Sequence, residues 1–343
     1  MLELTKRQLL AGAGAAALSL AGCTSIAGRQ EGSADSEVTA SFFVLGEFAN
    51  AVAGDAVSVD TLVPFGQHGH GWEPSSGIQR TVFDSTAFVY VGEGFQPWAD
   101  RVVENLRTDG ADVTVIAARH GVDLLPTSGE HHEEHGDEHG DHEEEHSDDH
   151  DDHETGEHTE TDHEQGEHDP HFWLDPTRAA TAVSTVEAGL REVFPDHADT
   201  FAANAAAYRQ ELAALDEAFS TRLADRERDA VLVAGHNAFQ YLAARYGFEV
   251  HGLTGISPDD SPSPQDIRRA QELIERDDIT HILAPAFESD RAARQLVDET
   301  DAREVLPISA IPGITEAWHE RGWGYLDVMR EVNLTSLTTG LGA

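Results

Sequence analysis

The sequence predicts an α/β protein of two lobes, each with a four-stranded, mostly parallel sheet flanked by helices, and one long helix that runs along both lobes. Three observations predict this fold. Roughly 280 residues of ordinary globular composition remain outside an N-terminal segment and a polar insert, which is enough for two modest lobes. From Val38, short apolar runs alternate with helical stretches, as in layered α/β domains. The helical pattern over 195–228 spans about 50 Å, which exceeds one lobe.

In the first half of the chain, strands and helices alternate with short connections, which is typical of parallel crossovers. The predicted strands are 38–45, 57–64, 87–92 and 113–117. The predicted helices between them are 48–53, 78–85 and 97–108. These elements form an N-terminal lobe over 38–129, which the segment 170–194 completes.

The second half repeats this organisation after the long helix, in which apolar residues recur at spacings of three and four. The predicted strands are 231–234, 249–253, 279–284 and 303–308. The predicted helices are 238–246, 264–276 and 290–299. We therefore expect a C-terminal lobe over 229–343, joined to the first lobe by the helix over 195–228.

The N-terminal segment has the pattern of an export signal that ends at the chain's single cysteine. Lys6 and Arg7 precede an apolar run that is too short to span a bilayer. The run ends in Leu-Ala-Gly before Cys23, which resembles a lipoprotein cleavage box. We expect a signal peptide over 1–22, a lipidated Cys23, and a flexible tether over 23–37 that holds the protein on the outer face of the cytoplasmic membrane. An uncleaved anchor and a chance Ala/Gly-rich helix are the alternatives.

The charge balance is strongly acidic, with 64 acidic and 22 basic residues, and Lys6 is the only lysine. An acidic, lysine-poor surface stays hydrated where salt screens its self-repulsion, so the composition is typical of salt-adapted, halophilic proteins. It argues against nucleic acid as a partner, because phosphate contacts need clustered lysine and arginine. We expect a monomer.

The insert over 130–169 is a low-complexity run of His, Asp, Glu and Gly without lysine or arginine. It has too few apolar residues to bury a core, so we expect disorder in the absence of a ligand. Neutral imidazoles bind zinc, and a chain of them offers many weak sites; the alternative is a solvated acidic spacer. The histidines concerned are His131, His132, His135, His139, His142, His146, His150, His153, His158, His163 and His168.

Three further histidines stand out by their position relative to the predicted strands. His70 lies in a loop that leaves a strand, His171 ends the insert, and His236 directly follows the apolar run 231–234. Each alone is more often an ordinary hydrogen-bonded residue, but ligand sites in α/β sheets gather at such strand ends. Three imidazoles with a fourth position for water or a carboxylate form a common zinc site.

Several motifs occur in order along the chain and carry a family resemblance. They are His-Gly-Trp-Glu-Pro at 70–74, Gly-Glu-Gly-Phe-Gln-Pro-Trp at 92–98, Asp-Pro-His-Phe-Trp-Leu-Asp-Pro at 169–176, Gly-His-Asn-Ala-Phe-Gln-Tyr at 235–241 and Tyr-Leu-Asp-Val-Met-Arg at 325–330. With these motifs the chain resembles the metal-binding solute-binding lipoproteins of zinc and manganese ABC transporters, the cluster A-I family. The insert is similar to the His-rich loop of the zinc-type members.

The resemblance implies two lobes joined by one long helix, with the metal in the cleft between them and an ABC transporter permease as partner. His70 and His171 match the ligands of the first lobe, and His236 matches the first ligand of the second lobe. In manganese-type members the residue at that last position resembles a glutamate. The histidine in this chain therefore favours Zn(II) over Mn(II).

The chain departs from the family at the fourth ligand. Many members have an aspartate in the last loop, where this chain has Pro-Ile-Ser-Ala-Ile-Pro at 307–312 without a carboxylate. A water completes the site in one reading, and Glu316 or His319 completes it in another. His68 is a further auxiliary candidate, two residues from His70.

The residues therefore favour a protein that captures Zn(II) outside the membrane and delivers it to a permease, and that is not an enzyme. A zinc hydrolase is one alternative, because three histidines and a water also form catalytic sites, but the chain has no His-Glu-x-x-His motif. An adhesin or interaction module on the same scaffold, with or without a metal requirement, is the other.

Overall fold

The computed structural model describes residues 37–343 except 65, 68–71, 128–167, 256 and 258–259. The expected signal peptide, Cys23, His68, His70 and the insert histidines from His131 to His163 lie outside the described residues. No helix in the described part of the chain is long and apolar enough to cross a membrane.

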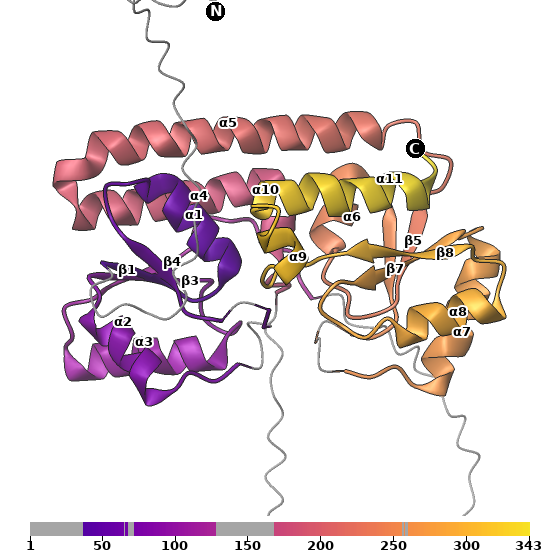
Figure 1. Cartoon of the computed structure of the whole chain (residues 1–343), viewed down its shortest axis with the longest axis horizontal. Helices are drawn as coiled ribbons and strands as arrows, with labels where there is room; N and C mark the ends of the chain where they lie inside the picture. Colours follow the sequence, from indigo (N-terminus) through magenta and orange to yellow (C-terminus); the bar gives the residue numbers. More distant parts are fainter. Residues whose placement is uncertain (1–36, 65, 68–71, 128–167, 256, 258–259) are drawn as a thin grey trace, which may run out of the picture.

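Two four-stranded parallel sheets form the framework of the protein (Figure 1). The first has the order β2-β1-β3-β4 and contains β1 (Val38–Ala40), β2 (Val59–Thr61), β3 (Ala87–Tyr90) and β4 (Thr114–Ala117). The second has the order β6-β5-β7-β8 and contains β5 (Ala230–Val233), β6 (Glu249–Gly252), β7 (His281–Pro285) and β8 (Glu304–Ile308). All neighbouring strands within each sheet are parallel, and the two sheets share one strand order. The predicted fold class is confirmed.

Helices cover both faces of each sheet (Figure 1). In the first half these are α1 (Phe43–Ala53), α2 (Ser76–Asp84), α3 (Pro97–Asp109), α4 (Pro176–Val193) and α5 (Ala198–Arg222). In the second half they are α6 (Gln240–Tyr246), α7 (Pro264–Arg276), α8 (Arg291–Glu299), α9 (Glu316–His319), α10 (Tyr325–Asp327) and α11 (Thr335–Leu341), with a π-helical segment, Val328–Leu334, before α11. The helix α5 packs on α4 and α1 and reaches the π-helical segment of the second lobe.

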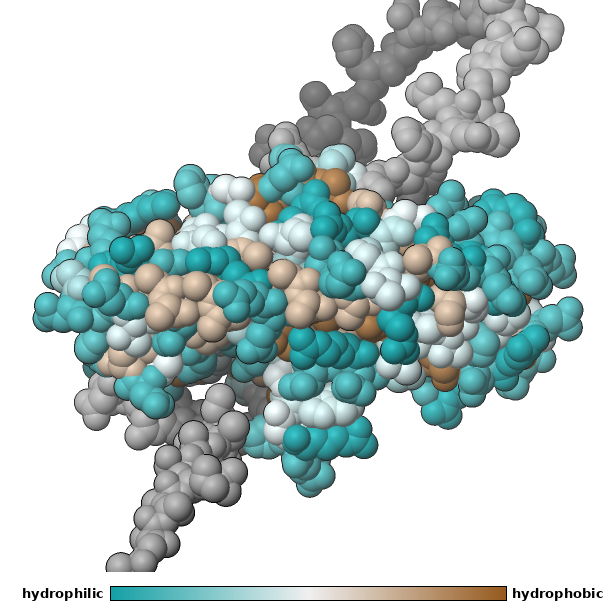
Figure 2. Space-filling view, turned by 90° about the horizontal axis from the view of Figure 1, so that it is seen from above, coloured by the Kyte–Doolittle hydropathy of each residue, from teal (hydrophilic) through white to brown (hydrophobic). Residues whose placement is uncertain are grey.

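Seen from above, the surface on the side of α5 mixes hydrophilic areas with pale brown ones of moderate hydropathy (Figure 2). The buried residues of α5 recur every three or four positions, namely Phe201, Ala205, Leu212, Leu215 and Phe219. This spacing is that of one helix face turned toward a core. The two halves of the chain are therefore bound along a common helical layer.

The first strand and the long helix differ most from the prediction, and the strand expected over 57–64 is shortened to Val59–Thr61. The strand expected over 38–45 ends at Ala40, and α1 already begins at Phe43. Both elements are buried, so the apolar run continues through the junction and hides the change of period. The long helix expected over 195–228 is instead a 3₁₀ turn, Pro195–His197, followed by α5, which ends at Arg222 after 25 residues. The buried Leu223 is its C-cap, and the Arg226 guanidinium donates to the carbonyl of Leu223 at 3.2 Å.

The segment 169–174 connects the two lobes. The Trp173 indole donates to the carbonyl of Ala310 at 2.8 Å, and the Tyr325 hydroxyl donates to the carbonyl of Trp173 at 2.5 Å. The Tyr241 hydroxyl donates to the carbonyl of Asp169 at 2.6 Å. Each of these three hydrogen bonds joins the segment to a residue of the second half of the chain, and all three are buried.

A second connection runs from α1 to the start of α10. Glu47 Oε2 accepts the backbone N–H of Tyr325 at 3.1 Å. A Cβ at Gly324 would lie 2.3 Å from the same oxygen, so a larger residue there would displace the Glu47 carboxylate. Burial raises the pKa of Glu47, the Tyr325 N–H opposes that rise, and the Asp327 carboxylate adds to it.

Glu47→Gln is expected to change how stability depends on pH. Because the pKa of Glu47 is raised above 4.5, the folded protein holds a proton there that the unfolded chain releases, and its unfolding free energy falls as pH rises through that window. The amide keeps an acceptor for Tyr325 but cannot ionise. The wild-type stability relative to the variant should therefore fall from pH 4.5 upward, by at most about 1.4 kcal/mol per pH unit. Urea denaturation of both proteins between pH 4 and pH 8 measures this; a constant difference contradicts it.

Candidate metal centre

His171 is held at the point where the chain returns to the first lobe after the insert. A backbone bridge pairs Pro126 with His168, and the Asp169 N–H donates to the carbonyl of Leu125 at 2.9 Å. After His171 a 3₁₀ turn, Phe172–Leu174, leads into α4. His171 is 1% exposed, so its place is set by buried backbone contacts on both sides.

The Asp169 carboxylate fixes the His171 ring. Asp169 Oδ1 accepts the backbone N–H of His171 at 2.9 Å and contacts its Nδ1 at 2.8 Å. Burial lowers the pKa of His171, and the Asp169 carboxylate partly opposes this shift. The neutral imidazole is therefore favoured more than in an ordinary exposed histidine. A carboxylate only accepts hydrogen bonds, so Nδ1 carries the proton and Nε2 carries the lone pair suited to a metal.

His236 occupies the equivalent place in the second lobe. It lies just beyond the carboxyl end of β5 and is 2% exposed. Glu288, which follows β7, accepts from His236 Nδ1 and from the His236 backbone N–H, the latter at 3.3 Å. Since β5 and β7 are neighbours in the sheet, their carboxyl ends bring these two residues together.

The two histidines meet between the lobes, with ring centres 5.5 Å apart and planes inclined by 47°. A zinc ion at about 2.0–2.1 Å from two imidazole nitrogens lies about 3.2 Å from each ring centre, and a tetrahedral angle then separates the centres by about 5 Å. The observed spacing fits two ligands of one zinc ion. Trp173 and Phe95 contact the His171 ring edge to face, with centres 5.4 and 6.2 Å away, and form an apolar wall.

The structure brings together two of the predicted ligands, His171 and His236. His171 and His236 are adjacent, whereas His70 and His68 lie outside the described residues. Glu316 and His319 are exposed on α9, and the described residues hold no group of three or more His, Cys, Asp or Glu side chains suited to a metal. His168 is also exposed, at the base of the insert.

Two residues of the centre were not identified from the sequence. Asp169 stands inside a quoted motif, but its role toward His171 follows only from the fold. Glu288 lies 52 positions from His236 and belongs to no motif. The signal that finds Glu288 is the sheet order, because β5 and β7 become neighbours only once the sheet is formed.

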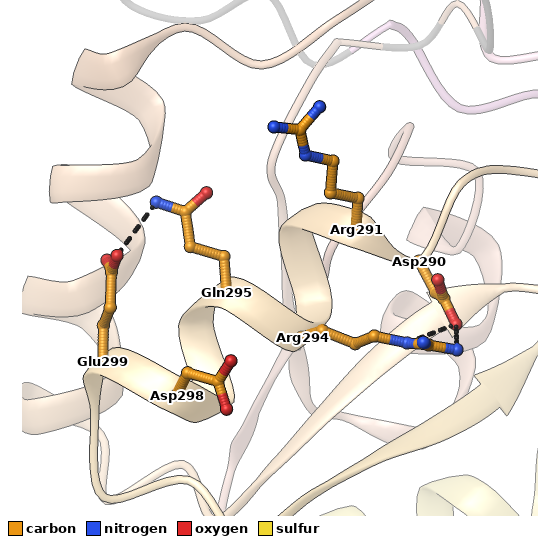
Figure 3. A pocket seen from close by; sticks show the side chains of 6 residues that line it. All are labelled: Asp290, Arg291, Arg294, Gln295, Asp298 and Glu299. Atoms are coloured by element: carbon orange, nitrogen blue, oxygen red, sulfur yellow. Dashed lines mark hydrogen bonds and ion pairs between the residues drawn. The ribbon is translucent and has the colours of Figure 1, made fainter.

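A depression of 380 Å³ lies along α8, and neither His171 nor His236 lines it (Figure 3). Its lining residues are Asp290, Arg291, Arg294, Gln295, Asp298 and Glu299. All come from α8 or the residue before it, and several pair with each other, as Arg294 does with Asp290 and Gln295 with Glu299. It offers no imidazole nitrogen to a metal.

Known proteins share both the sequence and the architecture. The zinc-binding lipoprotein AdcA of Streptococcus pneumoniae is 32% identical over 300 residues, which cover 88% of this chain and 54% of that protein. The high-affinity zinc uptake system protein ZnuA of Bacillus subtilis is 28% identical over 317 residues and 91% of each chain. The crystal structure of the Zn(II)-bound ZnuA-like domain of Streptococcus pneumoniae AdcA superposes with a TM-score of 0.70 at 27% identity, over 90% of this chain and 99% of that one.

The chain spans about half the length of the AdcA proteins it matches, and nearly all of the Bacillus protein. The family model described as zinc-uptake complex component A, periplasmic, matches residues 38–340. These residues include both sheets, α5, His171 and His236. This is a family of solute-binding transport components rather than enzymes, so the hydrolase alternative falls away. The order of the motifs, the two parallel sheets and the match over nearly the whole folded part agree, and the chain belongs to the ZnuA family.

Proposed function

We propose that this protein captures Zn(II) outside the cytoplasmic membrane and delivers it to an ABC transporter permease. The observation that carries the proposal is the pair His171 and His236, one from each lobe, with ring centres 5.5 Å apart and each Nδ1 held by a carboxylate. Both Nε2 atoms are thereby assigned to coordination. Zinc-binding and zinc-uptake relatives, and the family as a whole, support the same cargo.

The donor set favours zinc over manganese. Imidazole nitrogen suits Zn(II), whereas Mn(II) prefers carboxylate and water oxygen. In the centre as described, both carboxylates contact the Nδ1 edges of the histidines and not the Nε2 edges. His70 is the proposed third ligand, and a water is the proposed fourth, since Ser309 and Ala310 occupy the loop where a carboxylate would stand.

Attachment to the membrane is proposed through a lipid on Cys23, after removal of residues 1–22. The support is the Leu-Ala-Gly-Cys sequence and the description of the Streptococcus pneumoniae relative as a lipoprotein. Labelling of expressing cells with a radioactive fatty acid tests this. Label on the wild type and not on Cys23→Ala supports lipidation at that residue.

Thermal unfolding with added metal tests the cargo. Zinc that binds only the folded state stabilises it by about 2.7 kcal/mol at one hundred times the dissociation constant. For a chain of this size we expect the melting temperature to rise by roughly 5 °C once the free zinc concentration reaches that value. Manganese at the same concentration should give a smaller rise. A larger rise with manganese contradicts the choice of cargo.

The His-rich insert is proposed as a set of weak sites that collects zinc near the centre. Deleting 131–167 removes ten of its eleven histidines and leaves the backbone bridge of His168 with Pro126 in place. The expected result is a lower zinc stoichiometry in equilibrium dialysis, with one tight site retained. Loss of the tight site would show that the insert supplies a ligand to the centre instead.

A further inference from the structure

We propose that Glu288 is a positioning residue that fixes the ring orientation and tautomer of His236, and that it is not itself a ligand of the metal. The proposal rests on the zinc-capturing role given above and specifies which group sets the affinity of the second lobe's histidine.

One carboxylate holds His236 at two points. Glu288 accepts from the ring Nδ1 with one oxygen and from the backbone N–H with the other. Since a carboxylate only accepts, the contact selects the tautomer with hydrogen on Nδ1 and the lone pair on Nε2. The Nδ1 edge faces away from an ion bound at Nε2, so an oxygen in this position does not reach the same ion.

The chain around Glu288 is built to admit the carboxylate. A Cβ at Gly235 would lie 2.3 Å from Glu288 Oε2 and 2.6 Å from Pro285 Cγ, so only glycine leaves room beside His236. The turn that carries Glu288 is fixed at both ends. The Glu288 N–H donates to the carbonyl of Pro285 at 3.1 Å, and the Ala286 N–H donates to the carbonyl of Ile308 at 2.8 Å. The carboxylate is therefore placed before any metal arrives.

Burial gives the pair its energetic weight. The side chain of His236 is 3% exposed and that of Glu288 is 13% exposed. A carboxylate in such a place is costly unless it is hydrogen-bonded, and His236 provides both of the hydrogen bonds described for it. Asp169 holds His171 in the same manner, through its N–H and its Nδ1. In each lobe a carboxylate thus orients the histidine. In the second lobe this carboxylate comes from the end of a different strand, β7.

The test compares Glu288→Ala and Glu288→Gln with the wild type, using competition against a zinc chelator for affinity and ¹⁵N NMR of the histidine rings for the tautomer without metal. Removing a carboxylate that orients a metal-binding histidine weakens binding by roughly 10–100-fold. We expect that loss in Glu288→Ala, together with loss of the single Nδ1–H tautomer of His236. In Glu288→Gln the amide oxygen can still accept from Nδ1–H, but the amide NH2 cannot accept from the His236 backbone N–H. This variant should therefore keep the tautomer and lose less affinity than Glu288→Ala.

Glu304→Ala is the matched control, because Glu304 also faces a histidine of the same sheet, at 3.6 Å from His281 Nε2, but 62% of its side chain is exposed. It should bind zinc as the wild type does. Wild-type affinity and tautomer in Glu288→Ala would overturn the proposal. So would complete loss of binding with an unchanged metal-free melting temperature, which is the behaviour of a ligand. Wild-type binding by His236→Ala would instead show that the tight zinc site lies elsewhere, which removes the interlobe centre on which the proposed function rests.

Discussion

His236→Ala is expected to abolish the rise in melting temperature that zinc produces. The ring supplies one of the two described ligands, and alanine removes the Nδ1 donor from the Glu288 carboxylate, whose side chain is only 13% exposed. We expect zinc affinity to fall by more than the roughly 100-fold upper value for an orienting carboxylate, because a direct ligand is lost. At zinc concentrations that raise the wild-type melting temperature by several degrees, the variant should show no shift.

His251→Ala is the control for that experiment. His251 lies on β6 of the same sheet, with its side chain 22% exposed beside Glu249 and Asp277, and it takes no part in the interlobe pair. Its zinc response should equal that of the wild type. If His236→Ala keeps the wild-type shift, the zinc bound by this protein lies elsewhere, and the insert becomes the first place to look.

The fold was largely predictable because buried parallel strands appear in a sequence as short apolar runs. The strands β5, β6 and β7 each begin and end within two residues of the predicted bounds. The helix α7 matches its prediction completely, since Ser263 and Pro264 mark its start and Asp266 closes a capping box. Where such punctuation is missing, as between β1 and α1, the prediction failed.

The two histidines of the centre could be predicted from the sequence, but their arrangement with the carboxylates could not. His171 and His236 stand out because each follows a motif or a strand, yet their partners depend on which strands are neighbours. Glu288 reaches His236 only through the pairing of β5 with β7. A sequence with eight candidate strands does not state that pairing, so an acidic residue in a loop after β7 looks like any other surface acid.

The loop without a fourth carboxylate is built around a different network. Asn333, fully buried in the π-helical segment, accepts the Ser309 N–H and donates to the Ser309 carbonyl, both at 2.8 Å. The Ser309 hydroxyl accepts the Ile311 N–H at 3.0 Å, and Ile311 has a φ of +57°, which is rare for a β-branched residue. Asn333 holds this strained loop against the π-helical segment, and the Trp173 indole, which donates to the carbonyl of Ala310, joins it to the segment that bears His171. The sequence of 307–312 alone does not indicate that role.

Asp175→Ala is expected to have the largest effect on stability. The Asp175 side chain is fully buried, caps α4 by accepting the Thr177 N–H at 2.8 Å, and pairs with Arg178. Removing one partner of a buried ion pair costs about 3–5 kcal/mol, because the other charge stays behind. For a protein of this size that corresponds to a fall in melting temperature of roughly 10 °C. Asp175→Asn keeps a capping oxygen and should lose less.

The same substitution should also weaken zinc binding, because Asp175 stabilises the segment that presents His171. Arg178, its partner, lies over the Tyr241 ring at 5.0 Å, and the Tyr241 hydroxyl donates to the carbonyl of Asp169. Loosening Arg178 therefore disturbs the residue that orients His171. Arg191→Ala breaks a more exposed ion pair, with Glu187 on α4, and should cost about 1 kcal/mol or less without changing zinc affinity. Equal zinc affinity in Asp175→Ala and the wild type would show that His171 is positioned by Asp169 alone.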